Sequence, residues 1–353
     1  MRGGVVDGSE IRSVLVTGGA GFIGSCFVRH LAGGSYDSII VLDKLTYAGN
    51  LANLAPVIDD PRIRFVEGDI CDPDLMLELA GGVDAIVNFA AETHVDRSLQ
   101  SAGDFIQTDV YGVYIILETV RRLDLRRFVH VSTDEVYGHV PEGLSVETDP
   151  LEPRNPYSAS KAGGELMIRS YCESHGAPAI ITRGSNTYGP YQYPEKVLPI
   201  SVTNVLLGQP IRIYGDGMQV RDWLHVQDHV EGIEYVLHHG LTGEAYNIGG
   251  GNERRNLEIA KAILEELDAP GDLLHFVTDR AGHDRRYALD TSKVRRLGWQ
   301  PRFSLEDGLR DTIRWYRDNR DWWEPIRNSD EYKSYFEQNY GAREVLKVGQ
   351  WSE

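Results

Sequence analysis

Two adjacent carboxylic acids near the middle of the chain have the residue types that an elimination reaction needs. Asp134 and Glu135 follow a short apolar run and stand next to the hydroxyl of Thr133. Neighbouring carboxyl groups in a closed site can have widely separated pKa values, so that one donates a proton while the other accepts one. A solvated loop or a helix cap is the ordinary explanation for such a pair. Its place at the end of a buried strand, where ligands bind in α/β proteins, favours a catalytic role.

A tyrosine and a lysine follow the acid pair and suggest hydride transfer to or from a sugar alcohol. Tyr157 and Lys161 are four residues apart, so on a helix they share one face. A lysine cation beside a phenol favours the phenolate and lowers the pKa of the phenol, which suits Tyr157 to act as a base. We therefore expect one catalytic set for hydride transfer and dehydration: Thr133, Asp134, Glu135, Tyr157 and Lys161.

A glycine-rich turn near the start of the chain predicts a dinucleotide site. Gly18, Gly21 and Gly24 lie between an apolar run and a helical pattern, where glycines let the backbone approach a pyrophosphate at the helix N-terminus. Asp43 ends the second apolar run, 19 residues beyond Gly24. An acid there accepts hydrogen bonds from a ribose 2′-hydroxyl and repels a 2′-phosphate, so NAD is expected rather than NADP. Lys44, beside it, is the one neighbour that would suit a phosphate.

The expected cofactor contacts extend to the ends of the following strands. An acid after the third strand could hold the adenine, and small residues after the fourth would let the cofactor lie against the backbone. The expected cofactor-binding set is Gly18, Gly21, Phe22, Ile23, Gly24, Asp43, Lys44, Thr46, Asp69, Ile70, Ala90, Ala91, Thr108, Tyr157 and Lys161.

Buried strands alternating with helices are needed to bring these residues together. Short β-branched or aromatic runs predict buried parallel strands. They lie at 14–16, 39–42, 63–66, 85–89 and 128–131. Amphipathic patterns predict helices between them, at 24–31, 74–79 and 105–123. This alternation indicates an α/β fold with a doubly wound parallel (Rossmann) sheet.

The rhythm of strands and helices becomes irregular in the second half of the chain, where several prolines interrupt it. We expect a NAD-binding Rossmann domain over 12–189, to which part of 222–250 returns. A smaller mixed α/β substrate-binding lobe is expected over 190–325. The C-terminal tail, 326–353, is polar and aromatic, and the sequence assigns it no role.

The composition argues against several classes of partner. The 353 residues carry a net charge of −17, which disfavours nucleic acid or an anionic membrane surface. No apolar run reaches the roughly 18 residues of a membrane span, and the first residues lack the apolar core of a signal peptide. Three cysteines without metal-like spacing fit a reducing cytoplasm. An anionic substrate would need a local cationic pocket.

Several motifs resemble those of the extended short-chain dehydrogenase/reductases that act on nucleotide sugars. The acid pair after Ser132 and Thr133 is typical of the 4,6-dehydratase branch, and epimerases of the family usually lack it. Other matching segments lie at 90–98, 185–190, 194–196, 221–223 and 282–287. Thr93 stands where serine is commoner, and Thr187 stands where relatives usually have an asparagine that touches the nicotinamide side.

The resemblance implies a dehydration with no net redox change. Tyr157 would take the C4 hydroxyl proton while hydride passes to NAD, Glu135 would take the C5 proton, and Asp134 would protonate the departing C6 hydroxyl. The expected substrate is dTDP-glucose, with UDP-glucose left open, and the expected product is the 4-keto-6-deoxy sugar nucleotide. The alternatives are a nucleotide-sugar 4-epimerase and a non-catalytic NAD-binding protein on the same fold.

The resemblance also implies a set of substrate contacts, in which Arg221 is the strongest candidate for the diphosphate. The set is Thr93, His94, Thr133, Asn186, Glu195, Lys196, Arg221, Asn256, His283 and Tyr287. His225 and His229 lie four residues apart, but no third ligand accompanies them, so no metal is expected. Asp228 between them is expected to cap a helix.

Two helices carry apolar residues beyond one face, which favours a homodimer. They cover 105–123 and 158–172 and include Tyr111, Tyr114, Ile115, Ile116 and Met167. Relatives pair such helices into a four-helix bundle, whereas packing within a single chain is the alternative.

Overall fold

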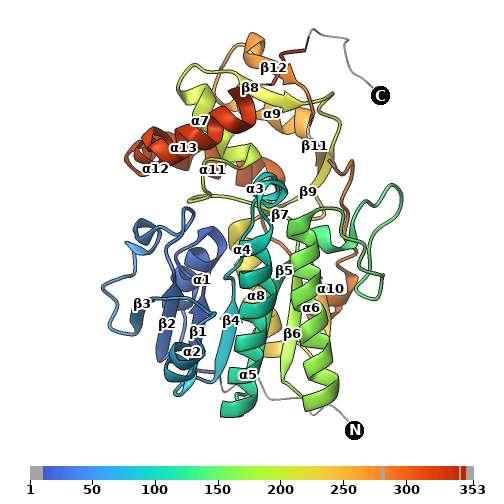
Figure 1. The fold of residues 1–353 in the computed structure, drawn as a ribbon. Helices are drawn as coiled ribbons and strands as arrows, with labels where there is room; N and C mark the ends of the chain where they lie inside the picture. The colour runs from blue at the N-terminus through green and yellow to red at the C-terminus, as the bar shows by residue number, and fades with distance from the viewer. Residues whose placement is uncertain (1–10, 280–282, 342, 347–353) are drawn as a thin grey trace.

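A seven-stranded sheet forms the larger part of the molecule (Figure 1). The structure is a computed structural model that describes residues 11–279, 283–341 and 343–346. The strands lie in the order β10-β6-β5-β4-β1-β2-β3, and every neighbouring pair is parallel. Their bounds are β1 Ser13–Thr17, β2 Ser38–Asp43, β3 Ile63–Glu67, β4 Ala85–Asn88, β5 Arg127–Thr133, β6 Ala179–Gly184 and β10 Ala245–Ile248. The predicted doubly wound parallel sheet is confirmed.

Helices cover both faces of this sheet because its strands are apolar on both sides. One apolar cluster joins the sheet to α1 and α8, and a second joins its other face to α2, α5 and α6. The bounds are α1 Phe22–Ala32, α2 Pro73–Ala80, α5 Val113–Leu123, α6 Pro156–His175 and α8 Val226–His239. These two cores hold the carboxyl ends of the strands in fixed positions.

The smaller lobe lies beyond those strand ends, in the upper part of Figure 1. It contains the sheets β11-β9-β7 and β12-β8, with helices α7, α9 and α11 around a third apolar cluster. The strand bounds are β7 Asn186–Tyr188, β8 Ile211–Tyr214, β9 Val220–His225, β11 Glu253–Arg255 and β12 Leu274–Val277. The helix bounds are α7 Val197–Leu206, α9 Asn256–Glu266 and α11 Leu305–Asp318.

The chain returns to the large sheet after its first passage through the smaller lobe. Helix α8 packs against α1, and β10 adds to the sheet edge with Ala245 opposite Ile181 of β6. Helix α10, Ser292–Leu297, packs near β10 after a second passage through the smaller lobe. Because the two lobes exchange segments, the domain boundaries drawn from the sequence stay a prediction.

One predicted helix, 105–123, differs in detail from the structure. It is divided into α4 Gly103–Ile106, the π-helical turn η3 Gln107–Gly112, and α5. A Cβ atom on Gly112 would lie 2.5 Å from Cδ1 of Ile70, so the turn packs close to the segment that follows β3. Turns of this kind often occur at functional sites, and this one carries Thr108 and Asp109.

The C-terminal tail is folded, which the sequence did not indicate. It continues α12 Arg320–Asn328 to its end and forms α13 Asp330–Phe336 and the turn η6 Glu337–Gly341; residues 342 and 347–353 lie outside the described part. The side chain of Trp323 is fully buried, and the hydroxyl of Tyr332 donates to the carbonyl of Pro194 at 3.0 Å. Short elements elsewhere are η2 Leu51–Leu54, α3 Val95–Gln100, η4 Asp134–Tyr137 and η5 Gly271–Leu273. Among the described residues, no helix has the length and apolar character to cross a membrane.

Candidate active site

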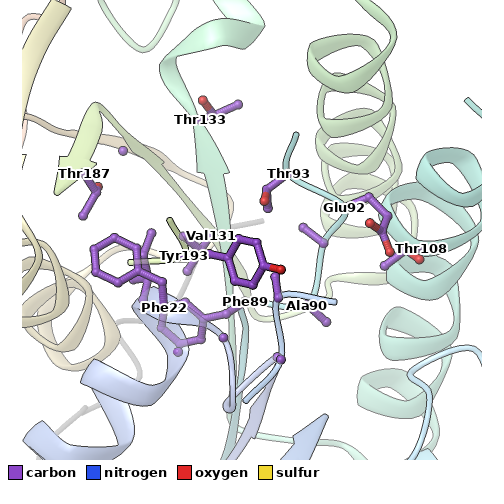
Figure 2. A pocket seen from close by; sticks show the side chains of 18 of the residues that line it. Phe22, Phe89, Ala90, Glu92, Thr93, Thr108, Val131, Thr133, Thr187 and Tyr193 are labelled. Carbon is purple, nitrogen blue, oxygen red and sulfur yellow. The ribbon is translucent and has the colours of Figure 1, made fainter. Parts of the chain in front are cut away.

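A cavity of about 300 Å³ opens at the carboxyl ends of the large sheet, where the smaller lobe faces it. Figure 2 shows that its side chains come from several strand ends and from the helical segment that carries Thr108. The cavity brings together most of the expected residues. They are Gly18, Gly21, Phe22, Ile23, Gly24, Asp43, Lys44, Thr46, Asp69, Ile70, Ala90, Ala91, Thr93, Thr108, Thr133, Asp134, Glu135, Tyr157, Lys161, Asn186, Glu195 and Lys196.

The glycine-rich turn is shaped for close backbone approach. Gly18 has φ +69°, and a Cβ atom there would lie 2.4 Å from the backbone nitrogen of Ala90. A Cβ atom on Gly24 would lie 2.2 Å from the carbonyl oxygen of Gly18. Helix α1 has Gly21 as its N-cap, and no side chain caps its first N–H groups. These features fit the pyrophosphate of a dinucleotide such as NAD.

The carboxylate of Asp43 is held in place at the end of β2. It accepts hydrogen bonds from the backbone nitrogens of Ala20, at 2.9 Å, and Leu45, at 2.8 Å. Burial raises its pKa, while these backbone donors act in the opposite direction. Each carboxylate oxygen has a further lone pair, so Asp43 can also accept from ribose hydroxyls.

Lys44 lies among acceptors and acids. Its ammonium lies 3.6 Å from a carboxylate oxygen of Asp69, 4.0 Å from one of Glu92, and 3.3 Å from the hydroxyl of Thr108. Its charge is therefore already balanced, and two of these neighbours would repel an added phosphate. This arrangement favours NAD over NADP at the ribose.

The acid pair sits where β5 ends. The hydroxyl of Thr133 accepts from the backbone nitrogen of Glu135 and donates to Asp134, both at 3.2 Å. Asp134 is 3% exposed, and burial raises its pKa to about 8, with Glu135 and Asp222 adding to the shift. At neutral pH Asp134 is therefore protonated and can act as an acid.

Glu135 is linked to the helix that carries the tyrosine. It accepts a hydrogen bond from the side-chain amide of Asn155 at 3.4 Å. The same Asn155 caps α6, where its side-chain oxygen accepts from the backbone nitrogen of Ser158 at 2.9 Å. The cap therefore fixes the start of α6 relative to the acid pair, and Tyr157 lies in the first turn of that helix.

Tyr157 and Lys161 share the inner face of α6 and are both buried. Burial raises the pKa of Tyr157 well above its usual value, and the charges of Glu135 and Asp109 raise it further. The expected lowering of the Tyr157 pKa beside Lys161 is therefore wrong for this structure, because burial dominates the shift. The ammonium of Lys161 donates to the carbonyl of Val131 at 2.9 Å, which holds it beside β5.

The loop before α7 forms another side of the cavity. Glu195 is 3% exposed and lies 3.5 Å from the guanidinium of Arg97, while burial raises its pKa. The ammonium of Lys196 donates to the carbonyl of Thr93 at 2.8 Å. Asn186 of β7 also lines the cavity.

Five expected substrate contacts lie outside the lining of this cavity: His94, Arg221, Asn256, His283 and Tyr287. Arg221 donates to the carbonyl of Asp284 at 2.9 Å and lies over the Tyr287 ring at 4.4 Å, and its charge lowers the pKa of Asp134. His94 is 2.9 Å from the hydroxyl of Tyr335, and His283 is 2.7 Å from Asp279. Their roles in binding stay a prediction.

The cavity also includes residues that the sequence did not assign to a cofactor or substrate site: Phe89, Glu92, Ser132, Ser185, Gln192, Tyr193 and His229. Thr187 lines it as well, and its hydroxyl donates to the carbonyl of Ser185 at 3.1 Å and contacts Nδ1 of His229 at 2.8 Å. Burial lowers the pKa of His229 to about 4, so this ring is neutral. The family resemblance pointed to position 187, but nothing in the sequence indicated its contact with His229.

The expected helix cap at Asp228 is wrong. His225 caps α8 and accepts from the backbone nitrogen of Gln227, whereas Asp228 accepts from the backbone nitrogens of Arg302, at 3.0 Å, and Phe303, at 2.9 Å. The carboxylate therefore anchors a distant loop, which no local pattern around Asp228 could indicate.

The chain is similar to known proteins over most of its length. The model of the GDP-mannose 4,6 dehydratase family matches residues 15–312. A dTDP-glucose 4,6-dehydratase of Streptomyces niveus is 53% identical over 324 residues, covering 90% of this chain and 96% of that protein. A dTDP-glucose 4,6-dehydratase of Streptomyces venezuelae, solved with NAD and TYD bound, is 53% identical with a TM-score of 0.87, covering 89% and 99% of the two chains. A UDP-glucose 4-epimerase of Thermotoga maritima, solved with UDP-glucose, is 30% identical with a TM-score of 0.81, covering 87% and 99%.

Proposed function

This chain belongs to the GDP-mannose 4,6 dehydratase family, and we propose that it converts dTDP-glucose into dTDP-4-keto-6-deoxyglucose and water with NAD as its cofactor. NAD would be held by the glycine-rich turn, by Asp43 and by the Tyr157–Lys161 face of α6. The chemistry that bound NAD supplies is reversible hydride acceptance, with hydride removed from C4 and later returned to C6. The cofactor is therefore regenerated in each turnover.

The first task of the protein is to remove the proton of the C4 hydroxyl. Tyr157 is the base, because its phenol is buried in the cavity and Lys161 shares its helix face. A C4 ketone makes the C5 proton acidic, whereas the C5 proton of the unoxidised sugar is not acidic. The oxidation therefore prepares the elimination that follows.

The second task is elimination across C5 and C6. Glu135 accepts the C5 proton, and Asp134 donates a proton to the departing C6 hydroxyl, which leaves as water. The observation that carries this proposal is the buried Asp134 next to Glu135, held by Thr133 at the end of β5, where burial raises the pKa of Asp134 to about 8. A positioned acid and base in one site are what a dehydration requires and what an epimerisation does not use.

An assay with two substrates tests the proposal. Purified protein is given dTDP-glucose and UDP-glucose side by side, and the alkaline absorbance of a 4-keto-6-deoxy sugar is followed. Product from dTDP-glucose supports the proposal. Faster product formation from UDP-glucose would show that the enzyme prefers the uridine nucleotide. Conversion of UDP-glucose to a C4 epimer without absorbing product would replace the proposal by the epimerase alternative.

We extend the proposal to a homodimer. Ile115 and Ile116, which suggested a dimer from sequence, are buried within the chain by α2 and α6. Large apolar side chains nevertheless stay exposed on α3, α4, η3 and α6, and these elements contact one another. They are Leu99, Ile106, Tyr111 and Leu166, with exposed fractions of 42–58%. A second copy of this chain would cover such a face.

The expected cytoplasmic location remains part of the proposal. Cys26, Cys71 and Cys172 are free thiols, and Cys26 is buried. Burial raises the pKa of each thiol, so all three favour the protonated, less reactive form, which fits a reducing compartment.

A further inference from the structure

The catalytic helix packs against a buried carboxyl that the proposed reaction does not use. Asp109 lies in the π-helical turn η3 and has no solvent-exposed surface. The contact is close, because a Cβ atom on Gly164 of α6 would lie 2.5 Å from the carbonyl oxygen of Asp109. The turn is thus pressed against the helix that carries Tyr157 and Lys161.

The hydrogen bonds around Asp109 are best satisfied when it carries a proton. The hydroxyl of Ser160 lies 2.6 Å from Oδ2 of Asp109 and 2.8 Å from the carbonyl oxygen of Tyr157. Ser160 has a single hydroxyl proton, so it cannot fully satisfy two acceptors. A protonated Asp109 donates to Ser160, and Ser160 then donates to the carbonyl of Tyr157. The other oxygen of Asp109 accepts from the backbone nitrogen of Glu92 at 3.2 Å in either state.

The charge of Asp109 acts on both members of the catalytic pair. Burial raises the pKa of Asp109 to about 6, and the charge of Lys161 opposes this shift. When ionised, Asp109 raises the pKa of Lys161 and also raises the pKa of Tyr157. A negative Asp109 therefore keeps Lys161 protonated but makes the phenol harder to ionise.

Other charged groups near this cluster are already balanced or neutral. Glu165, on the same helix, forms a buried ion pair with Arg183 at 2.6 Å. Glu92, which follows β4, lies 4.0 Å from the ammonium of Lys44. Burial and the charge of Lys161 lower the pKa of His130 on β5 well below its usual value, so His130 is neutral. Asp109 is consequently the group of this cluster that changes charge near neutral pH.

We propose that Asp109 is a positioning residue whose protonation state, in the turn that Ser160 joins to the backbone of Tyr157, sets the pH at which Tyr157 becomes an effective base. The inference rests on the proposed role of Tyr157 in the oxidation. As pH rises, ionisation of Asp109 opposes ionisation of Tyr157. The acidic limb of the rate profile therefore lies at higher pH than it would beside a neutral Asp109.

The main test is Asp109→Asn, which imitates the protonated carboxyl. Its amide can donate to Ser160, while its oxygen still accepts from Glu92. We expect the acidic limb of kcat/KM to move to lower pH by roughly one unit, the low end of shifts caused by a neighbouring charge. Asp104→Asn is the matched control, because this exposed acid lies on the adjoining α4. The control should keep the parent profile.

A second measurement does not depend on turnover. With ¹³C-labelled aspartate, one carboxyl resonance should titrate near pH 6 in the parent and be missing in Asp109→Asn. In Ser160→Ala, that resonance should titrate at lower pH, because the protonated carboxyl loses the hydroxyl to which it donates. If Asp109→Asn does not fold, parent and Ser160→Ala spectra decide the question.

The outcomes separate the two proposals. If the parent forms no keto sugar, the proposed function fails, whatever Asp109 does. If the parent is active and Asp109→Asn reproduces its acidic limb, or if Asp109 titrates with the ordinary surface carboxyls, the role of Asp109 is overturned.

Discussion

At the scale of single residues, the raised pKa that suits Asp134 to act as an acid also makes the stability of the folded protein depend on pH. Its pKa in the folded protein, about 8, lies above the unfolded value of about 4. The folded state therefore binds this proton more tightly, and the stability that the proton provides is fully present below the unfolded pKa. It is lost progressively as pH rises through the folded pKa.

Asp134→Asn should reveal that loss. The amide is neutral at every pH, so the melting temperature of the variant should exceed that of the parent at pH 8.5. The difference should shrink as pH is lowered toward 5. Thermal unfolding at several pH values measures this, while the same variant should lose at least about 10²-fold in dehydration. If the difference in melting temperature between variant and parent does not depend on pH, protonation of the buried Asp134 is not its cause.

Tyr157→Phe should stop the reaction before any redox change. A phenyl ring cannot take the C4 hydroxyl proton, and the loss of a general base commonly costs about 10²–10⁴-fold. Neither NADH absorbance nor keto sugar should accumulate when substrate is added. Turnover near the parent rate would exclude Tyr157 as the base.

Glu135→Gln should separate oxidation from elimination. Tyr157 and Lys161 are intact in this variant, so the C4 oxidation can proceed, but the amide cannot accept the C5 proton. We expect some enzyme-bound NADH, little exchange of deuterium at C5, and elimination slowed by about two orders of magnitude or more. The substitution keeps an acceptor for Asn155, so the cap of α6 survives. Dehydration at the parent rate would make the acid pair structural and favour the epimerase alternative.

At the scale of secondary structure, the parallel sheet was predictable and the π-helical turn was not. Strands such as 14–16 and 39–42 are β-branched and buried on both sides, so composition alone locates them. The turn at Gln107–Gly112 lies within a continuous helical pattern. Its departure from α geometry depends on packing against α6 and Ile70, which are distant in sequence. Sequence therefore predicted Thr108 as a site residue but not Asp109.

The substrate side was predictable only through family resemblance. Glu195 and Lys196 line the cavity, whereas Arg221 makes contacts within its own lobe. Isolated charged residues have no periodic pattern, so only the folded arrangement decides which of them face the cavity. The same holds for Tyr193 and His229, which come from a loop and a helix with no motif of their own.

The proposed dimer is a property of the exposed faces of α3, α4, η3 and α6. Leu166→Glu places a charge on a side chain that is 57% exposed, so the folded monomer should tolerate it. In a dimer, the same charge would be buried without a partner, which is costly. Light scattering after size-exclusion chromatography should show the mass halved. Leu241→Glu, at a site 48% exposed beyond these helices, is the control and should keep the parent mass.

At the scale of the whole molecule, Arg97 joins three parts of the chain. Its guanidinium lies 3.6 Å from the centre of the ring of Tyr47, in the segment after β2, and 3.5 Å from Glu195 of the smaller lobe. It also lies 3.6 Å from Glu331 and over the ring of Tyr335, both in the C-terminal tail. The tail, which had no assigned role, thereby closes one side of the junction between the lobes.

Arg97→Met should weaken that junction. The substitution keeps an apolar stem but leaves Glu195 without this cation, and removing one partner of a buried ion pair costs about 3 kcal/mol or more. Urea unfolding measures the loss. Glu331→Gln removes an exposed partner of the same arginine and should cost less than about 1 kcal/mol. Equal costs for the two variants would show that burial of Glu195 is not what makes the junction stable.

The late position of β10 affects how the protein is made on the ribosome. Strand β6 has an unpaired edge until β10 is synthesised, and the whole smaller-lobe segment from β7 to β9 emerges first. A nascent chain that lacks β10 and α8 exposes apolar sheet surface, which is prone to association with other chains. Chaperone binding should therefore peak while residues between β6 and β10 are being translated. A chain released after Leu224 should be found in the insoluble fraction, whereas full-length chains should not.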